Sequence, residues 1–186
     1  MRNNKYLFLI TLIFFTLGFI NIHLALLGTA CMLLPLILLF VFKRKIWCQG
    51  YCPRASLYTT CGKLTSKKSY KTPKFFTKGK MKWIMLAYFG MNLFIIIMST
   101  SKVASGAKPP MDYLRFLLVI PFAKEMPQLL DLGHIAPWIT HLSYRFFSMM
   151  MTTTFLGLML AIIFKPRTWC TICPIATVSD LYIKKV

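Results

Sequence analysis

Residues 24–58 read LALLGTACMLLPLILLFVF-KRK-IWCQGYCPRASLY, and this stretch decides the fold. Its first part, Leu24–Phe42, is almost wholly apolar and is close to the length of about 20 residues that a helix needs to cross a bilayer. Three basic residues follow directly, and a pair of cysteines comes after them. The stretch therefore predicts a membrane helix that ends in a basic segment bearing two cysteines.

The composition extends this interpretation to the whole chain. Its 186 residues are 57% hydrophobic, with a mean hydropathy of +0.62, whereas a soluble domain exposes more polar surface. Three further apolar runs lie at about Tyr6–Ile20, Trp83–Met98 and Phe146–Phe164. We predict an all-α membrane protein in which four transmembrane helices form two hairpins, with both termini on the cytoplasmic side.

Two apolar segments could be something other than membrane spans. The first run lacks a small-residue cleavage site, so it is predicted to be a membrane span and not a signal peptide. Tyr113–Phe122 is apolar but only about ten residues long, which predicts an interfacial or re-entrant segment on the outer side. The chain is then a single membrane domain over 1–186, made of a first hairpin (1–64), a basic loop (65–82) and a second hairpin (83–186).

The charge pattern predicts the orientation. The formal net charge is +19, and 18 of the 23 basic residues fall in segments 1–5, 43–82 and 165–186, together with one acid, Asp180. Because basic residues collect in cytoplasmic loops, these segments are expected in the cytoplasm of a cell membrane. They are expected to contact anionic lipid and an acidic soluble redox carrier, and the pattern gives no reason to predict nucleic acid.

Two similar blocks follow two of the apolar runs. Residues 47–56 read WCQGYCPRAS and residues 169–177 read WCTICPIAT. Both run Trp-Cys, two or three residues, Cys-Pro, one residue, Ala and then Ser or Thr. This similarity predicts a parallel internal repeat of the two hairpins. Proline after the second cysteine predicts the first position of a new helix.

The two blocks supply four candidate ligands, which are Cys48, Cys52, Cys170 and Cys173. Four thiolates on one side of a membrane suit a soft metal, either zinc or the iron of an iron–sulfur cluster. Disulfides are disfavoured in a reducing cytoplasm, and redox-active thiols without metal are a further alternative. The flanking basic residues are expected to lower the thiol pKa values; they are Lys43, Arg44, Lys45, Arg54, Lys165 and Arg167.

The first block resembles the Cys-x-x-x-Cys-Pro signature of the membrane 4Fe-4S-binding family, which includes the polyferredoxin-like membrane proteins of the NapH and NosR type. The resemblance rests on Trp47–Leu57, with an aromatic residue before the first cysteine and proline after the second. It implies a helical core with cysteine motifs at cytoplasmic helix ends, and electron transfer among quinols, ferredoxins and other redox proteins. It also favours an iron–sulfur cluster, 4Fe-4S before 2Fe-2S, over zinc.

The chain departs from that family in two ways. The second block, Cys170–Pro174, is one residue shorter than the usual spacing, which puts its ligand geometry in question. The chain also lacks the ferredoxin-like tail with dense cysteine runs that many relatives carry. Six cysteines are too few for two four-thiolate clusters, so one cluster is expected, within one chain or at a dimer interface. Ser105-Gly106-Ala107 is followed by Lys108 and therefore lacks the threonine of a flavin-attachment motif.

The remaining polar and sulfur-bearing residues have weaker assignments. Cys61 is expected at the end of a short helix as a bystander, and Cys31 is expected to pack inside a span. His23 is assigned to a tight outer turn. The remaining outer residues are expected to have ordinary interfacial roles, with a quinone head group, a pairing with Asp131 or a bound haem or copper as alternatives; they are His134, His141 and Arg145.

No catalytic set of side chains appears in the sequence, which has only four scattered acids. The prediction is an electron-transfer component of a larger redox assembly and not a stand-alone enzyme. A single cluster cannot by itself carry electrons across about 30 Å of hydrocarbon, so another membrane redox subunit or a quinone must complete the path. The competing interpretation is a non-enzymatic membrane scaffold or assembly factor with a structural four-cysteine zinc site.

Overall fold

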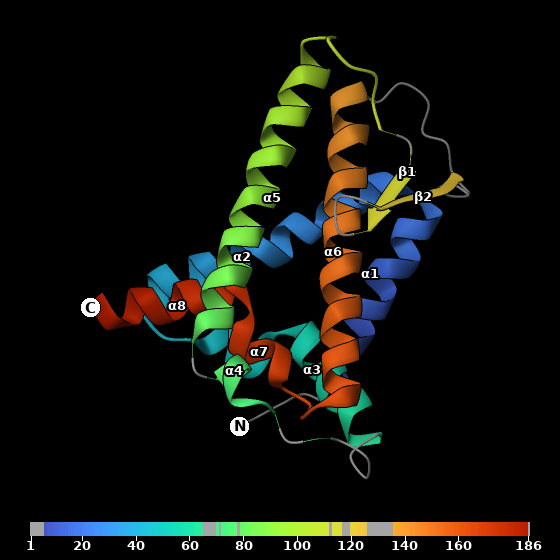
Figure 1. The fold of residues 1–186 in the computed structure, drawn as a ribbon. Coiled ribbons are helices and arrows are strands. Elements are labelled where there is room, and N and C mark those ends of the chain that lie inside the picture. The colour runs from blue at the N-terminus through green and yellow to red at the C-terminus, as the bar shows by residue number, and fades with distance from the viewer. Residues whose placement is uncertain are drawn as a thin grey trace. The chain divides into compact units, whose positions relative to one another are not determined.

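A computed structural model describes residues 6–64, 70, 72–77, 79–111, 113–116, 120–125 and 136–185. Figure 1 shows the elements in chain order. They are α1 (Phe8–Ile20), the 3-10 helix η1 (Ile22–Leu26), α2 (Leu27–Phe42), the π-helical turn η2 (Trp47–Tyr51), α3 (Pro53–Leu64), α4 (Lys74–Thr77), α5 (Lys80–Ala104), β1 (Tyr113–Phe116), β2 (Ile120–Glu125), α6 (Pro137–Ile163), α7 (Thr168–Ile172) and α8 (Pro174–Lys185).

Three helical segments are long and apolar enough to cross a membrane, and they are Ile22–Phe42, Lys80–Ala104 and Pro137–Ile163. Each contains one of the predicted runs or most of it. The remaining run forms α1, which is apolar but has only 13 residues and is therefore shorter than a usual span. The prediction of four spans is thus supported for three of them.

The segment predicted to lie at the membrane interface forms a β-hairpin. Strands β1 and β2 pair antiparallel, with Arg115 opposite Pro121 and Phe116 opposite Ile120. Aromatic and β-branched residues favour strands, and pairing satisfies the backbone groups of a segment too short to cross the bilayer. The prediction of a non-spanning segment agrees with this hairpin, but its strand structure was not anticipated.

The chain divides into two compact units, which we describe separately. The cysteine unit comprises Met1–Thr11, Cys31–Phe89 and Thr154–Val186, and it contains all six cysteines. The hairpin unit comprises Leu12–Ala30 and Gly90–Thr153, and it contains β1, β2 and all three histidines of the sequence. The cysteine unit carries 18 of the 23 basic residues, so the charge asymmetry of the sequence coincides with this division.

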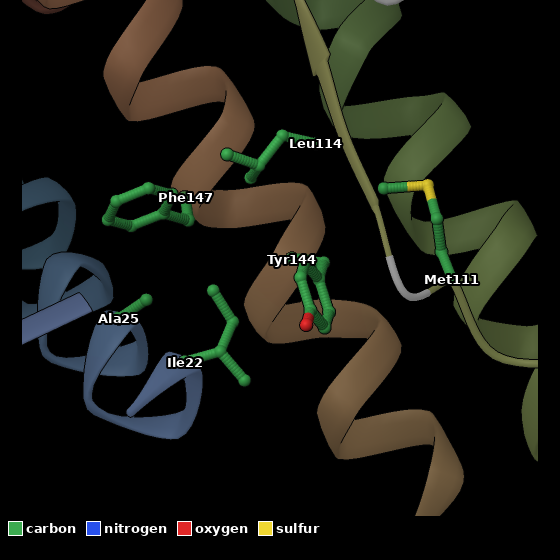
Figure 2. Packing of buried hydrophobic residues seen from close by; sticks show 6 residues of the cluster. All are labelled: Ile22, Ala25, Met111, Leu114, Tyr144 and Phe147. Atoms are coloured by element: carbon green, nitrogen blue, oxygen red, sulfur yellow. The ribbon is translucent and has the colours of Figure 1, made fainter. Parts of the chain in front are cut away.

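The core of the hairpin unit surrounds Phe147 of α6, whose side chain is fully buried. Figure 2 shows Phe147 with the other members of this cluster, which are Ile22, Ala25, Met111, Leu114 and Tyr144. The aromatic rings of Phe15 and Phe19 meet Phe147 edge to face, with centroids 5.7 and 5.9 Å away. The sequence of α1 thus contributes a face of phenylalanines to this core.

The core of the cysteine unit joins the two cysteine blocks. Its buried members are Tyr58, Ala161, Trp169 and Ile172, and Cys173 packs against them. Tyr58 follows the first block, whereas Trp169, Ile172 and Cys173 belong to the second block. The hydrophobic core of this unit is therefore built around the segments that carry the candidate ligands.

Candidate metal centre

The two cysteine blocks differ in length, and the difference appears as a difference in helical turn. In the first block Trp47–Tyr51 forms a π-helical turn, and in the second block Thr168–Ile172 forms a short α-helix. A π turn is wider by one residue than an α turn. The extra residue of the first block is therefore accommodated inside the turn that carries Cys48.

After these turns the two blocks follow the same course. Cys52 has φ −73° and ψ 112°, and Cys173 has φ −59° and ψ 129°, so both are extended. A proline then opens a helix of 12 residues in each block, α3 from Pro53 and α8 from Pro174. This is the position that the sequence predicts for the two prolines. Proline lacks a backbone N–H, and at the first position of a helix that N–H would have no partner within the helix.

The residue four positions after each second cysteine is buried and closes the first helical turn. The backbone N–H of Ser56 donates to the carbonyl of Cys52 at 3.2 Å, and that of Thr177 donates to the carbonyl of Cys173 at 3.0 Å. The Thr177 hydroxyl donates to the same Cys173 carbonyl at 3.1 Å. The shared Ser or Thr of the two blocks thus has a structural role at a helix start.

Helix α3 packs against the segment that leads into the second block. A Cβ on Gly62 would lie 2.7 Å from the Pro166 side chain, so glycine permits a close approach here. The Arg167 Nε group donates to the Thr59 hydroxyl at 3.4 Å. These contacts hold the helix that follows Cys52 against the turn that carries Cys170.

An ion pair adds a polar link within the same unit. Lys45, just before the first block, pairs with Asp180 of α8, just after the second. Asp180 is the single acid in the residues of the cysteine unit. The one acid predicted for the basic side of the chain therefore connects the two blocks.

Tyr58 packs against residues of the second block. Its side chain is fully buried, and a Cβ on Gly157 of α6 would overlap its ring and hydroxyl. Burial raises the pKa of Tyr58 well above its ordinary value, and the neighbouring thiols raise it further; they are Cys173, Cys52 and Cys170. Tyr58 is thus adjacent to thiols from both blocks.

The four candidate thiols influence one another across the two blocks. Burial raises the pKa of Cys48 to about 11, and Cys173 and Cys52 add to this shift. Burial likewise raises the pKa of Cys170 to about 12, with Cys52, Cys173 and Cys48 adding to it. The thiols of the two blocks therefore lie within electrostatic range of one another.

The expected lowering of the thiol pKa values by basic neighbours is wrong in its net direction. Lys45 does lower the pKa of Cys48, and Arg167 lowers that of Cys170, but the loss of hydration outweighs both. Burial away from water disfavours the charged thiolate. The flexible Lys and Arg side chains do not compensate for this loss, whereas a directly bound cation would. The sequence shows which cations flank a thiol, but it does not show how deeply the thiol is buried.

Backbone groups also point at one of the candidate ligands. The pKa of Cys173 is raised by burial, and hydrogen bonds from the backbone of Ala176 and Ile175 partly offset this effect. The sulfur therefore sits at the start of α8, where backbone N–H groups have no partner within the helix. Hydrogen bonds of this kind stabilise thiolate ligands and tune the potentials of iron–sulfur clusters.

The four sulfurs are not gathered around one point. Within the described residues, no three His, Cys, Asp or Glu side chains stand close enough to hold a metal ion. No disulfide joins any of the six cysteines, all of which the structure describes. The donor set itself fits an iron–sulfur cluster, since it consists of soft thiols, one of them hydrogen-bonded by backbone N–H groups.

The other two cysteines lie on helices of the same unit. Cys61 is on α3, near its end as the sequence predicts, and Cys31 is on α2. Both are partly buried. Neither helix position belongs to the two Trp-Cys blocks, so the assignment of both as non-ligands stays a prediction.

Among the outer candidates, His141 has a structural environment. Its Nδ1 accepts from the Met111 backbone N–H at 3.2 Å, and its Nε2 lies 3.1 Å from the Ser99 hydroxyl. His134 lies outside the described residues, and α6 begins after it, at Pro137. His23 contacts Asn21 at 2.9 Å and the Thr140 hydroxyl at 3.1 Å, as suits a residue in a turn.

A family model described as a 4Fe-4S binding domain matches residues 24–72 and 147–186. These segments make up 89 of the 186 residues and contain all six cysteines. No curated protein and no solved structure shows a significant match to the chain. The match supports an iron–sulfur family and identifies the cofactor as an iron–sulfur cluster of the 4Fe-4S type.

Proposed function

We propose that this chain is a membrane electron-transfer protein in which Cys48, Cys52, Cys170 and Cys173 hold one 4Fe-4S cluster. The observation that carries the proposal is the equivalence of Cys52 and Cys173. Both are extended residues that precede a proline-started helix of the same length, and both lie in segments that match the family model. The π turn supports equal roles for the two pairs despite their unequal spacing.

The residues of the chain provide ligands, shielding and a positive environment. The thiols must lose their protons to serve as ligands, and Lys45 and Arg167 favour the charged forms of Cys48 and Cys170. The backbone of Ile175 and Ala176 favours the thiolate of Cys173 in the same way. Tyr58 and Trp169 are buried beside Cys173 and shield that thiol from water. When bound, a 4Fe-4S cluster accepts and donates single electrons.

The membrane placement belongs to the same proposal. In this arrangement four helices cross a cell membrane, both termini and the two cysteine blocks lie on its cytoplasmic side, and the two hairpins form a repeat. Three helices of sufficient length and the concentration of basic residues in the cysteine unit support it. It resembles the NapH and NosR type of membrane protein, whose members serve in larger redox assemblies.

The basic residues before the first cysteine block supply a docking site for the electron donor. Lys43 and Arg44 are exposed directly before the first block. An acidic ferredoxin or flavodoxin is the donor that this charge favours, because complementary charge accelerates association. The electron then passes to a membrane redox subunit or a quinone, since one cluster on one face cannot span about 30 Å of hydrocarbon.

The metal content distinguishes this function from its competitor, a scaffold with a structural zinc site. We expect the protein purified under argon to be brown, with iron and acid-labile sulfide near four of each per chain, as a 4Fe-4S cluster requires. Two of each per chain in a dimer would place the cluster between two chains. A colourless protein with one zinc and no iron would rule out electron transfer through this site.

A further inference from the structure

A second group of polar side chains lies in the hairpin unit. His141, Arg145 and Ser148 follow one another on α6 at spacings of four and three residues, so they share one face of the helix. All three belong to a helix long and apolar enough to cross a membrane. A charged residue in such a helix marks a functional site more often than a structural one.

The β-hairpin is attached to this face on both sides of Arg145. The Met111 backbone N–H donates to His141 at 3.2 Å, and the Arg115 backbone N–H donates to the Ser148 hydroxyl at 3.1 Å. Arg145 lies between these two hydrogen bonds on the helix. Met111 and Arg115 are therefore attached to α6 on either side of Arg145 along the helix.

The two arginines of this region have unused donors. The Nε atoms of Arg115 and Arg145 are both buried, and neither has a hydrogen-bond partner among the residues that the structure describes. Arg115 donates instead through Nη2 to the Tyr113 hydroxyl, and its guanidinium lies 5.1 Å from the centre of the Tyr113 ring. The hydrogen bond from the Arg115 backbone to Ser148 holds Arg115 against α6 three residues from Arg145. Among the described residues, the buried hydroxyl of Thr100, next to Ser99 on α5, also has no partner.

We propose that Arg115 and Arg145 form a binding site for a phosphate oxyanion in the hairpin unit. Native proteins leave few buried donors without partners, and two neighbouring guanidinium groups are seldom left without a counter-charge. An oxyanion satisfies both needs, because its oxygens accept from the Nε–H groups and its charge offsets the two cations. A neutral quinone head group satisfies the donors alone and leaves both charges uncompensated.

His141 gives the site a fixed and neutral neighbour. Its Nδ1 accepts a hydrogen bond from the Met111 N–H and is therefore unprotonated, so its Nε2 carries the proton toward the Ser99 hydroxyl. Both nitrogens are occupied by protein groups. The oxyanion is thus bound by the arginines, and His141 holds the hairpin beside them.

The phosphate has two sources with the same chemistry, an anionic lipid headgroup and free inorganic phosphate. Thermal melting of the intact detergent-purified protein separates them. The probes are phosphatidylglycerol, phosphatidylcholine as the lipid without net charge, inorganic phosphate, and a short-chain quinone. We expect the melting temperature to rise to a plateau as phosphatidylglycerol or inorganic phosphate is added. The probe that produces this rise identifies the source of the phosphate.

Three variants connect this response to the two arginines. Arg145→Gln and Arg115→Gln should each weaken the response to the anion about tenfold or more, because a charge-assisted hydrogen bond is lost. Lys102→Gln, which removes an exposed cation from α5 of the same unit, should leave it within about twofold. If Arg145→Gln does not fold, the comparison of Arg115→Gln with Lys102→Gln carries the test.

Two results would overturn the proposal. One is a wild-type protein that responds to the quinone and to neither anion. The other is a triple variant, Asp112→Asn, Glu125→Gln and Asp131→Asn, that gains an anion response which the wild type lacks. In that case the acids of the chain itself are the partners of the arginines. Iron content measured in parallel distinguishes either result from failure of the cluster, since the two sites lie in different units.

Discussion

Cys52 and Cys173 adopt the same extended conformation before two helices of 12 residues, although Cys48 and Cys170 precede them by four and three residues. A π turn in the first block and an α turn in the second account for the difference. π turns are rare and are frequent at functional sites. The shorter second motif is therefore compatible with an equal role for its cysteines.

The π turn predicts an asymmetric response to changes of spacing. Gly50 has no atom within 4 Å of the Cβ it lacks, and Tyr51 is exposed. Deletion of Gly50 gives the first block the spacing of the second, and we expect the iron content to stay within about twofold of wild type, because the deleted residue carries no side chain that packs against the rest of the unit.

The mirror change in the second block should have the opposite outcome. Insertion of a glycine between Thr171 and Ile172 displaces Ile172, which is 1% exposed, from the core of the cysteine unit. We expect loss of most of the iron, measured per chain after anaerobic purification. Equal iron content in the deletion and the insertion would show that the turns do not position the ligands.

The contact between Tyr58 and Gly157 predicts a stability effect. Gly157→Ala places a methyl group against a fully buried ring, and overpacking of this kind costs about 1–3 kcal/mol. We expect a lower thermal melting temperature. Gly90→Ala is the matched control on a second apolar helix, since nothing lies within 4 Å of that position, and it should not lower the melting temperature. Equal effects of the two changes would contradict this packing.

The raised thiol pKa values predict how stability of the cluster-free protein varies with pH. Burial raises the pKa of Cys48 to about 11 and that of Cys170 to about 12, from 9.0. The folded form then holds more protons than the unfolded form between these values, so the contribution of these two thiols to the free energy of unfolding is constant below about pH 9 and falls as pH rises above it. Denaturant unfolding of cluster-free protein at several pH values measures this.

Serine variants supply the control for the pH effect. Cys48→Ser and Cys170→Ser should each flatten the decline, because the group that titrates is removed. Cys61→Ser changes a cysteine outside the two blocks and should leave most of the decline. A stability that increases above pH 9 in the wild type would mean that the thiolates are favoured in the folded form.

The exposed basic residues predict the kinetics of electron delivery. Lys43→Glu with Arg44→Glu should slow reduction by an acidic flavodoxin about tenfold or more at low salt, because electrostatic steering acts on the association rate. The difference should shrink as salt increases. Stopped-flow reduction measures the rate, and Lys102→Glu in the hairpin unit is the control. An equal loss in the control would exclude the proposed docking surface.

The sequence predicts the parts of this fold that depend on local chemistry. Runs such as Leu24–Phe42 determine the long helices, and proline after each second cysteine determines where α3 and α8 begin. The two blocks identify the candidate thiols, and the family match covers the same residues. These features follow from spacing and residue type alone.

Features that depend on packing were not predictable in the same way. The hairpin of Tyr113–Phe116 with Ile120–Glu125 needs a pairing between strands that no periodicity reveals. Tyr58 stands beside the first motif in sequence, but its position next to the thiols depends on Gly157, about 100 residues away along the chain. The prediction that the thiol pKa values are lowered was wrong for the same reason, because the burial of a thiol depends on how the whole unit packs.

In the proposed site, two cysteines from each block hold one redox-active cluster. The most direct measurement is the electron paramagnetic resonance spectrum of the anaerobic protein after dithionite reduction, integrated per chain for the wild type and for Cys→Ser changes at positions 48, 52, 170, 173, 61 and 31. We predict one unpaired electron per cluster in the wild type, its loss in the first four variants and its retention in the last two. A signal that survives Cys170→Ser or disappears in Cys61→Ser would contradict the ligand set.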